Sequence, residues 1–170
     1  YYLPNIKIPK EIEITNDLLY AAEGKEMLVI STPTQYIRSS LTPLKNVDLK
    51  NSIITSVSKG IEIDTLKLVN EIIAEVLINS DKEKISCLSG PSHAEEVAKK
   101  VPTVVVCANR NLETAKIIQK VFSNETFRVY TSSDVTGVEL GGALKNVIAI
   151  ASGIADGAGF GDNTKAAIMT

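Results

Sequence analysis

The sequence predicts an α/β fold with a parallel sheet, because short strand-like runs alternate with longer helix-like ones. Runs rich in β-branched residues and nearly continuous in apolar character are typical of strands buried on both faces. They lie at 27–31, 52–57, 85–88 and 103–107, with a weaker edge-strand candidate at 127–130. No Asn-Gly or Asp-Gly dipeptide joins these runs, which favours helical crossovers over hairpins.

Helices are expected between the strands. Apolar residues recur at spacings of three and four between Asp64 and Asn79, which indicates an amphipathic helix. The stripe consists of Leu66, Val69, Ile72, Ile73, Val76 and Leu77. The run 112–122 repeats the pattern. Ser92 and Glu95 match a capping box, which predicts a helix that follows the 85–88 strand and begins at Ser92.

Composition limits the classes of partner. The 170 residues are 44% hydrophobic and 22% charged, as in a globular protein with a core. The 18 basic and 20 acidic residues give a net charge of −2, which argues against binding of nucleic acid or an anionic membrane. No apolar run approaches the roughly 20 residues of a membrane span.

Cys87 and Cys107, in apolar runs, suggest reduced core thiols and a cytoplasmic location. A single His leaves no metal-ligand cluster and no Ser/His/Asp or Cys/His grouping.

The chain changes character after Tyr130. A polar joint at 131–134 precedes a long segment rich in Gly and Ala without a strand signal. We therefore divide the chain into residues 1–131 and residues 132–170. The glycine-rich run 157–161 lacks the strand and the spacing of a dinucleotide loop. It is interpreted as a turn between two helices, the second capped by Asp162 or Asn163.

Lys145 has unusual neighbours if this segment is helical. Gly141, Gly142 and Ala149 would share its face. Each glycine costs about 1 kcal/mol relative to Ala, so a close approach of backbone or ligand is expected to offset that cost. An ammonium beside Asn146 in such a shallow groove would lose hydration, which suits acid–base work. The alternative is a close helix–helix contact with a solvated lysine.

Two further candidates follow strands. Lys59 and Gly60 come directly after the 52–57 strand, where ligands bind in open parallel sheets. Gly90 and Ser92 follow the 85–88 strand and lead into a helix, which suits an anion or a polarised oxygen. The alternatives are a solvated strand-end lysine and an ordinary capped turn. His93, as a lone His, is not taken as a catalyst.

Several longer motifs are specific enough to compare with known families. The most specific run is Gly-Val-Glu-Leu-Gly-Gly-Ala-Leu-Lys-Asn-Val at 137–147, continued by Gly-Asp-Asn-Thr-Lys-Ala-Ala at 161–167. It is accompanied by Ser-Lys-Gly at 58–60, Ser-Gly-Pro-Ser-His-Ala-Glu-Glu-Val-Ala at 89–98 and the opening Tyr-Leu-Pro at 2–4. In order and spacing these motifs resemble those of NAD(P)-dependent glycerol-3-phosphate dehydrogenases of the bacterial type. The resemblance spans essentially the whole chain.

The resemblance implies a reaction and its residues. Members of this family reduce dihydroxyacetone phosphate to sn-glycerol 3-phosphate with NADH or NADPH, reversibly, for glycerophospholipid synthesis. By motif, Lys145 is the catalytic lysine that exchanges a proton with the C2 oxygen, and Asn146 orients it. Lys59, also expected to be catalytic, lies between cofactor and substrate and binds both. Positioned lysines would stabilise and protonate the oxygen that gains charge when hydride arrives.

The resemblance also implies binding roles and a wider architecture. Gly90 and Ser92 line the substrate pocket with Lys59 and Lys145, and Ala94 lies by the nicotinamide. His93 departs from the residue common in the family, with little functional consequence expected. The implied fold is a Rossmann-like, mostly parallel sheet that lacks its first βαβ unit, followed by the start of an all-helical substrate domain.

The ends of the chain bear on its activity. The phosphate loop would lie before Tyr1 and further substrate ligands after Thr170, so we expect a central fragment that is inactive alone. The full-length protein is expected to be a homodimer. Two alternatives stay open: a related two-domain hydroxyacid or ketoacid reductase, and a truncated α/β domain without catalysis.

Overall fold

A five-stranded sheet forms the centre of the computed structural model, which describes residues 3–4 and 6–170. Tyr2, the first residue of the Tyr-Leu-Pro motif, lies outside the described residues. The strands are β1 Met27–Ile30, β2 Ile53–Ser56, β3 Ile85–Ser89, β4 Thr103–Ala108 and β5 Phe127–Ser132. They lie side by side in chain order, and β5 is an edge strand as expected. All five predicted strands are therefore confirmed.

The sheet is mostly parallel, with one exception. Strands β1, β2 and β3 pair in parallel and so do β4 and β5, but β3 and β4 are antiparallel. The expectation of helical crossovers throughout is wrong here. The helix between β3 and β4, α4 Ala94–Ala98, has only five residues. The connection therefore turns back at the end of β3. It does not cross a face of the sheet, as a connection between parallel strands must.

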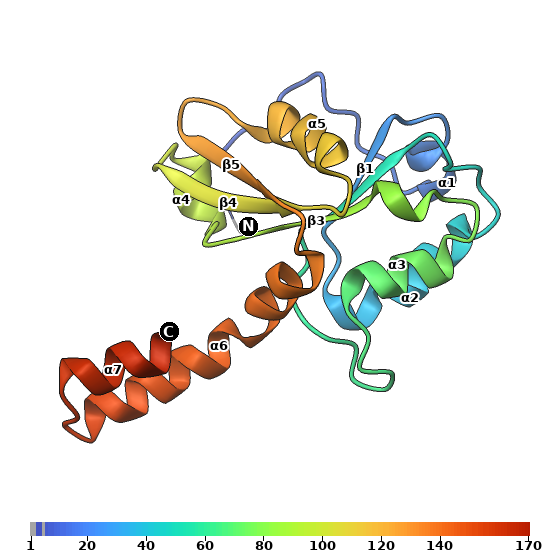
Figure 1. Cartoon of the computed structure of the whole chain (residues 1–170). Helices are drawn as coiled ribbons and strands as arrows, with labels where there is room; N and C mark the ends of the chain where they lie inside the picture. The colour runs from blue at the N-terminus through green and yellow to red at the C-terminus, as the bar shows by residue number, and fades with distance from the viewer. Residues whose placement is uncertain (1–2, 5) are drawn as a thin grey trace.

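Helices cover both faces of the sheet (Figure 1). Helices α2 Thr34–Leu41 and α3 Val69–Val76 lie together on one face, and α5 Leu112–Phe122 lies on the other. Each face has its own buried cluster. One joins Ile37, Ile54, Ile72 and Ile73, and the other joins Leu88, Val105, Ile118 and Val129. A short α1 Leu18–Ala22 and two 3-10 turns, η1 Thr42–Leu44 and η2 Lys82–Lys84, complete this part.

Two predicted helix starts differ from the structure. Helix α5 has the predicted bounds, but α3 begins at Val69 rather than Asp64, and Leu66 of the predicted stripe is 77% exposed. Helix α4 begins at Ala94 with His93 as its N-cap, so the predicted Ser92 capping box does not form. Because Ser92 precedes the N-cap, its hydroxyl donates instead to the Gly90 carbonyl at 3.4 Å.

The glycine-rich segment forms a long helix, α6 Val135–Gly157, which leaves the sheet (Figure 1). The side chain of Asp134 caps it, accepting from the Gly137 N–H at 2.8 Å. By length and composition α6 could cross a membrane, with a mean hydropathy of 1.3 over an 18-residue window. That property was not anticipated from the sequence. Helix α7 Asp162–Met169 folds back beside α6 (Figure 1).

The turn between α6 and α7 is the predicted helix-to-helix turn. Its predicted cap is wrong, because Gly161 is the N-cap and no side chain caps the helix. Asp162 is the first residue of α7, and its carboxylate pairs with Lys165 at 3.1 Å. The Lys165 ammonium also contacts Asp156 at 2.9 Å, which ties α7 to the end of α6.

Candidate active site

Lys59 lies at the carboxyl end of the sheet, just beyond β2. Its Nζ donates to the Gly90 carbonyl at 2.7 Å, so the predicted residues that follow β2 and β3 meet. Lys59 is half-buried. Burial, with a smaller contribution from the positive charge of Lys145, lowers the pKa of the Lys59 ammonium. The site therefore holds a lysine whose proton is easier to remove than usual.

Gly90 is required by its backbone conformation. Its φ is +155°, and a Cβ there would lie 2.8 Å from the Cα of Val105 on β4. Only glycine fits such a close approach without strain. The chain can therefore turn tightly after β3, and this turn places the Gly90 carbonyl against Lys59.

Helix α6 crosses the same edge of the sheet. A Cβ on Gly142 would lie 2.7 Å from the Oγ of Ser89 and 3.5 Å from the Cγ of Lys59. The predicted close approach is therefore confirmed at Gly142, where the neighbours are the end of β3 and a lysine. Gly141 faces open space. A helix without a side chain at Gly142 can lie directly on the site.

Lys145 follows Gly142 by three residues, which places both on one side of α6. Its Nζ donates to the Oδ1 of Asn146 at 2.7 Å, so the amide expected to orient the lysine contacts it. Lys145 lies close enough to Lys59 for its charge to lower the pKa of Lys59. The expectation that Lys145 itself loses hydration is wrong for this structure, because Lys145 is exposed and Lys59 is the half-buried ammonium.

The two remaining predicted residues lie at the margin. Ser92 is exposed and reaches the cluster through the Gly90 carbonyl, which also accepts from Lys59. Ala94 is the first residue of α4 and is exposed. The structure brings together Lys59, Gly90 and the Lys145 helix, and leaves the start of α4 facing solvent.

Sequence reasoning missed Glu139, a buried carboxyl group at the base of α6. It is 8% exposed, and its Oε1 accepts from the backbone N–H of Asn70 at 2.9 Å. Burial raises the pKa of Glu139 to about 7, and the nearby charge of Glu71 adds to this. Glu139 precedes Gly142 by three residues, so the face that meets the sheet carries both. A carboxylate among small and apolar residues was the available signal.

Ser89 was missed as well. It ends β3 and lies beneath Gly142. The sequence marks it only as the residue before Gly90, so nothing local indicated a partner on α6.

Comparison with known families decides what this cluster belongs to. Residues 1–115 match the model of the NAD-dependent glycerol-3-phosphate dehydrogenase N-terminus. The chain belongs to this family. Residues 134–170 match the model of the C-terminus of the same enzymes.

Individual glycerol-3-phosphate dehydrogenases agree with the family models. The chain is 51% identical over 168 residues to glycerol-3-phosphate dehydrogenase [NAD(P)+] of Fusobacterium nucleatum, covering 99% of this chain and 50% of the relative. It is 48% identical over 169 residues to that of Chlorobium phaeobacteroides, covering 99% and 51%. The chain thus spans about half the length of the curated relatives it matches.

Solved structures of the family share the fold. Glycerol-3-phosphate dehydrogenase from Coxiella burnetii matches with a TM-score of 0.83 and 34% identity, over 98% of this chain and 50% of that one. The Plasmodium falciparum glycerol-3-phosphate dehydrogenase matches with a TM-score of 0.85 and 28% identity, over 96% and 45%. These neighbours confirm the Rossmann-like, mostly parallel fold.

Proposed function

We propose that this chain carries the proton-transfer centre of an enzyme that interconverts dihydroxyacetone phosphate and sn-glycerol 3-phosphate with NAD(H) or NADP(H). The observation that carries the proposal is the close approach of α6 to Lys59, which brings Lys145 near enough for its charge to act on Lys59. Lys59 follows β2, and Lys145 lies on the helix that seats Gly142 against Ser89. Two ammonium groups at one edge of the sheet suit a substrate with a phosphate and a carbonyl that becomes an alkoxide.

Lys145 is assigned the acid–base role. Its exposed ammonium can reach a substrate on the open side of α6, above Gly141, where a Cβ would meet no protein atom within 4 Å. In reduction, the C2 oxygen gains negative charge and takes a proton from the Lys145 Nζ. In oxidation, the neutral amine takes that proton back. Asn146 holds the Nζ through its Oδ1 and limits the directions in which the ammonium points.

Lys59 is assigned an electrostatic role in the reaction and a role in binding both the substrate and the cofactor. Its Nζ is anchored on the Gly90 carbonyl, so its charge is preorganised before a substrate arrives. Gly90 and Ser92 would line the substrate pocket next to the Lys59 ammonium. A fixed charge near the developing oxyanion stabilises the transition state more than the ground state.

The residues present fit the reactive end of a nicotinamide dinucleotide. The half-buried Lys59 and the open start of α4 at Ala94 would adjoin the nicotinamide, and the cofactor when bound supplies the hydride. The adenosine and pyrophosphate ends need a glycine-rich loop after a strand, which the family's N-terminal domain provides in a Rossmann fold. The residues that choose between NAD and NADP would lie in the region that binds the adenosine end.

Three broader assignments accompany this proposal. The domain boundary lies near residue 131, which is supported by the departure of α6 from the sheet and by the second family model beginning at residue 134. The complete protein is a cytoplasmic homodimer that supplies glycerophospholipid synthesis. The apolar face of α6 then packs within the substrate domain rather than in a lipid bilayer.

The test needs a complete enzyme. We define the chimera as the Fusobacterium nucleatum relative in which residues 1–170 of this chain replace the matching half. The chimera is expected to oxidise NADH or NADPH with dihydroxyacetone phosphate and to ignore pyruvate, a 2-oxo acid without phosphate. Activity with pyruvate and none with dihydroxyacetone phosphate would favour a related ketoacid reductase and contradict the proposal.

A further inference from the structure

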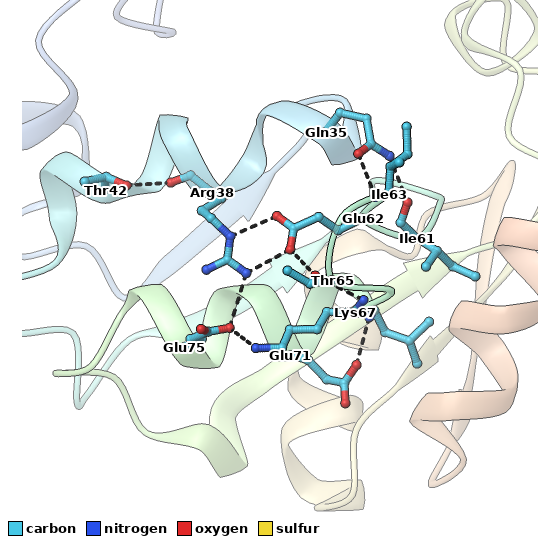
Figure 2. A network of polar contacts seen from close by, with 11 residues as sticks. Gln35, Arg38, Thr42, Ile61, Glu62, Ile63, Thr65, Lys67, Glu71 and Glu75 are labelled. Atoms are coloured by element: carbon cyan, nitrogen blue, oxygen red, sulfur yellow. Dashed lines mark hydrogen bonds and ion pairs between the residues drawn. The ribbon is translucent and has the colours of Figure 1, made fainter.

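One face of α2 holds the backbone that follows Lys59. The hydroxyl of Thr34 donates to the Lys59 carbonyl at 3.0 Å. The Gln35 side chain makes two bonds, donating from Nε2 to the Ile61 carbonyl at 2.8 Å and accepting at Oε1 from the Ile63 N–H at 3.0 Å. We call these contacts of Thr34 and Gln35 the clamp, and Figure 2 shows the Gln35 contacts from close by. Hydrogen bonds from one helix thus fix the Lys59 backbone and two residues of the segment that follows it.

An ion pair between the half-buried Arg38 and the buried Glu62 adds to these contacts (Figure 2). The Arg38 guanidinium donates from Nε and Nη2 to the two carboxylate oxygens of Glu62, at 2.9 and 2.8 Å. Glu62 is 7% exposed and also accepts from the Thr65 hydroxyl. These donors, Arg38 above all, lower the pKa of Glu62 to about 2. Bidentate pairs of this kind fix geometry as well as charge.

The loop from residue 60 to residue 68, which this clamp holds, has little apolar support of its own. Ile63 and Leu66 are 72% and 77% exposed. Leu66 has a φ of +56°, a left-handed conformation that is unfavourable for a leucine. Such conformations persist where the surroundings over-determine them. Polar contacts, rather than buried apolar surface, therefore keep the 60–68 loop in place.

The 60–68 loop begins directly after Lys59. Gly60 has a φ of +139°, and a Cβ there would lie 3.0 Å from the Thr34 Oγ1, so the chain turns tightly against α2. The Lys59 backbone is thus fixed by Thr34 and by the loop, while its Nζ is fixed by Gly90. If the loop were released, the Lys59 backbone would be free to move, and its ammonium would no longer be held in one direction.

We propose that Gln35 and Arg38 on α2, together with Glu62 in the loop, are positioning residues that hold the 60–68 loop and so aim the ammonium of the preceding lysine at the substrate. The inference rests on the proposed function of Lys59. It adds to that function a specific ion pair, Arg38–Glu62, which acts on Lys59 through the loop.

The experiment is a double-mutant cycle in the chimera. Arg38→Gln is measured alone and together with Lys59→Ala, with kcat and KM for dihydroxyacetone phosphate and with thermal unfolding for each protein. Gln35→Ala, which keeps the ion pair, serves if Arg38→Gln does not fold. Lys116→Gln is the matched control, since it removes a cation from the exposed Lys116–Glu113 pair on α5.

Displacement of a catalytic group by about 1 Å costs on the order of 10- to 100-fold in rate. We therefore expect Arg38→Gln to lower kcat by at least tenfold when Lys59 is present and by less than about twofold when Lys59→Ala is present. Lys116→Gln should leave kcat unchanged. A merely structural ion pair would lower kcat equally in both backgrounds, and that result, or an unchanged kcat, would overturn the inference.

Failure of the proposed function gives a different pattern. If Lys59→Ala alone leaves kcat unchanged, or the parent chimera does not reduce dihydroxyacetone phosphate, the role of Lys59 is wrong and the inference falls with it. If Lys59→Ala lowers kcat and Arg38→Gln does not, only the positioning role is wrong.

Discussion

Replacement of Glu139 by glutamine gives the most quantitative prediction. Burial raises the pKa of Glu139 from 4.5 to about 7. Between these values the folded protein keeps a proton that the unfolded chain releases, so the free energy of unfolding falls as pH rises from 4.5 to 7 and is level above 7. A shift of this size corresponds to about 3 kcal/mol, at roughly 1.36 kcal/mol for each pKa unit.

Glu139→Gln removes this titration but keeps an oxygen that accepts from the Asn70 N–H. The chimera carrying Glu139→Gln should equal its parent in stability near pH 4.5 and exceed it by about 3 kcal/mol at pH 8. Urea midpoints measured at pH 5, 6, 7 and 8 give this difference. Glu139→Asp is the matched control, because it retains a carboxyl group and should retain the pH dependence.

The result that would refute this reasoning is a difference between Glu139→Gln and its parent that does not change between pH 5 and pH 8. The carboxyl group of Glu139 would then ionise in the folded protein as easily as in the unfolded chain. A difference that grows in the opposite direction would mean that the α3 N-terminus stabilises the carboxylate more than burial penalises it.

Three further predictions concern packing. Gly142→Ala should lower stability by about 1–3 kcal/mol because its methyl group overlaps a side chain, whereas Gly141→Ala, in open space, should raise it by about 1 kcal/mol; urea unfolding compares the two. Gly90→Ala combines backbone strain with a clash and should cost about 3 kcal/mol or prevent folding, as circular dichroism would show. Burial raises the pKa of the Cys87 and Cys107 thiols to about 12, so iodoacetamide should label them only after unfolding, as mass spectrometry would detect.

Much of the sheet could be predicted from the sequence because buried strands have a local signal. Four short, largely apolar runs and the weaker candidate at 127–130 each form a strand. Helix α5 has its predicted bounds because its apolar spacing is uninterrupted. Periodicity failed at Leu66, where the spacing continues but Arg38, from a different helix, holds the chain in a loop through Glu62.

The candidate site was predictable only in part. Lys59, Gly90 and Gly142 stood out because they follow strands or interrupt a helix, and the structure brings them together. The antiparallel pairing of β3 and β4 and the buried position of Glu139 depend on contacts between residues far apart in the sequence. No local pattern encodes such contacts.

The kinetics of Lys145→Ala in the chimera test the central claim most directly. Loss of a general acid–base group lowers rates by about 10²- to 10⁴-fold. We expect a fall of that size in kcat for reduction of dihydroxyacetone phosphate, with unchanged thermal unfolding because Lys145 is exposed. A variant that folds and keeps a near-normal kcat would contradict the assignment of Lys145 as the residue that exchanges the proton.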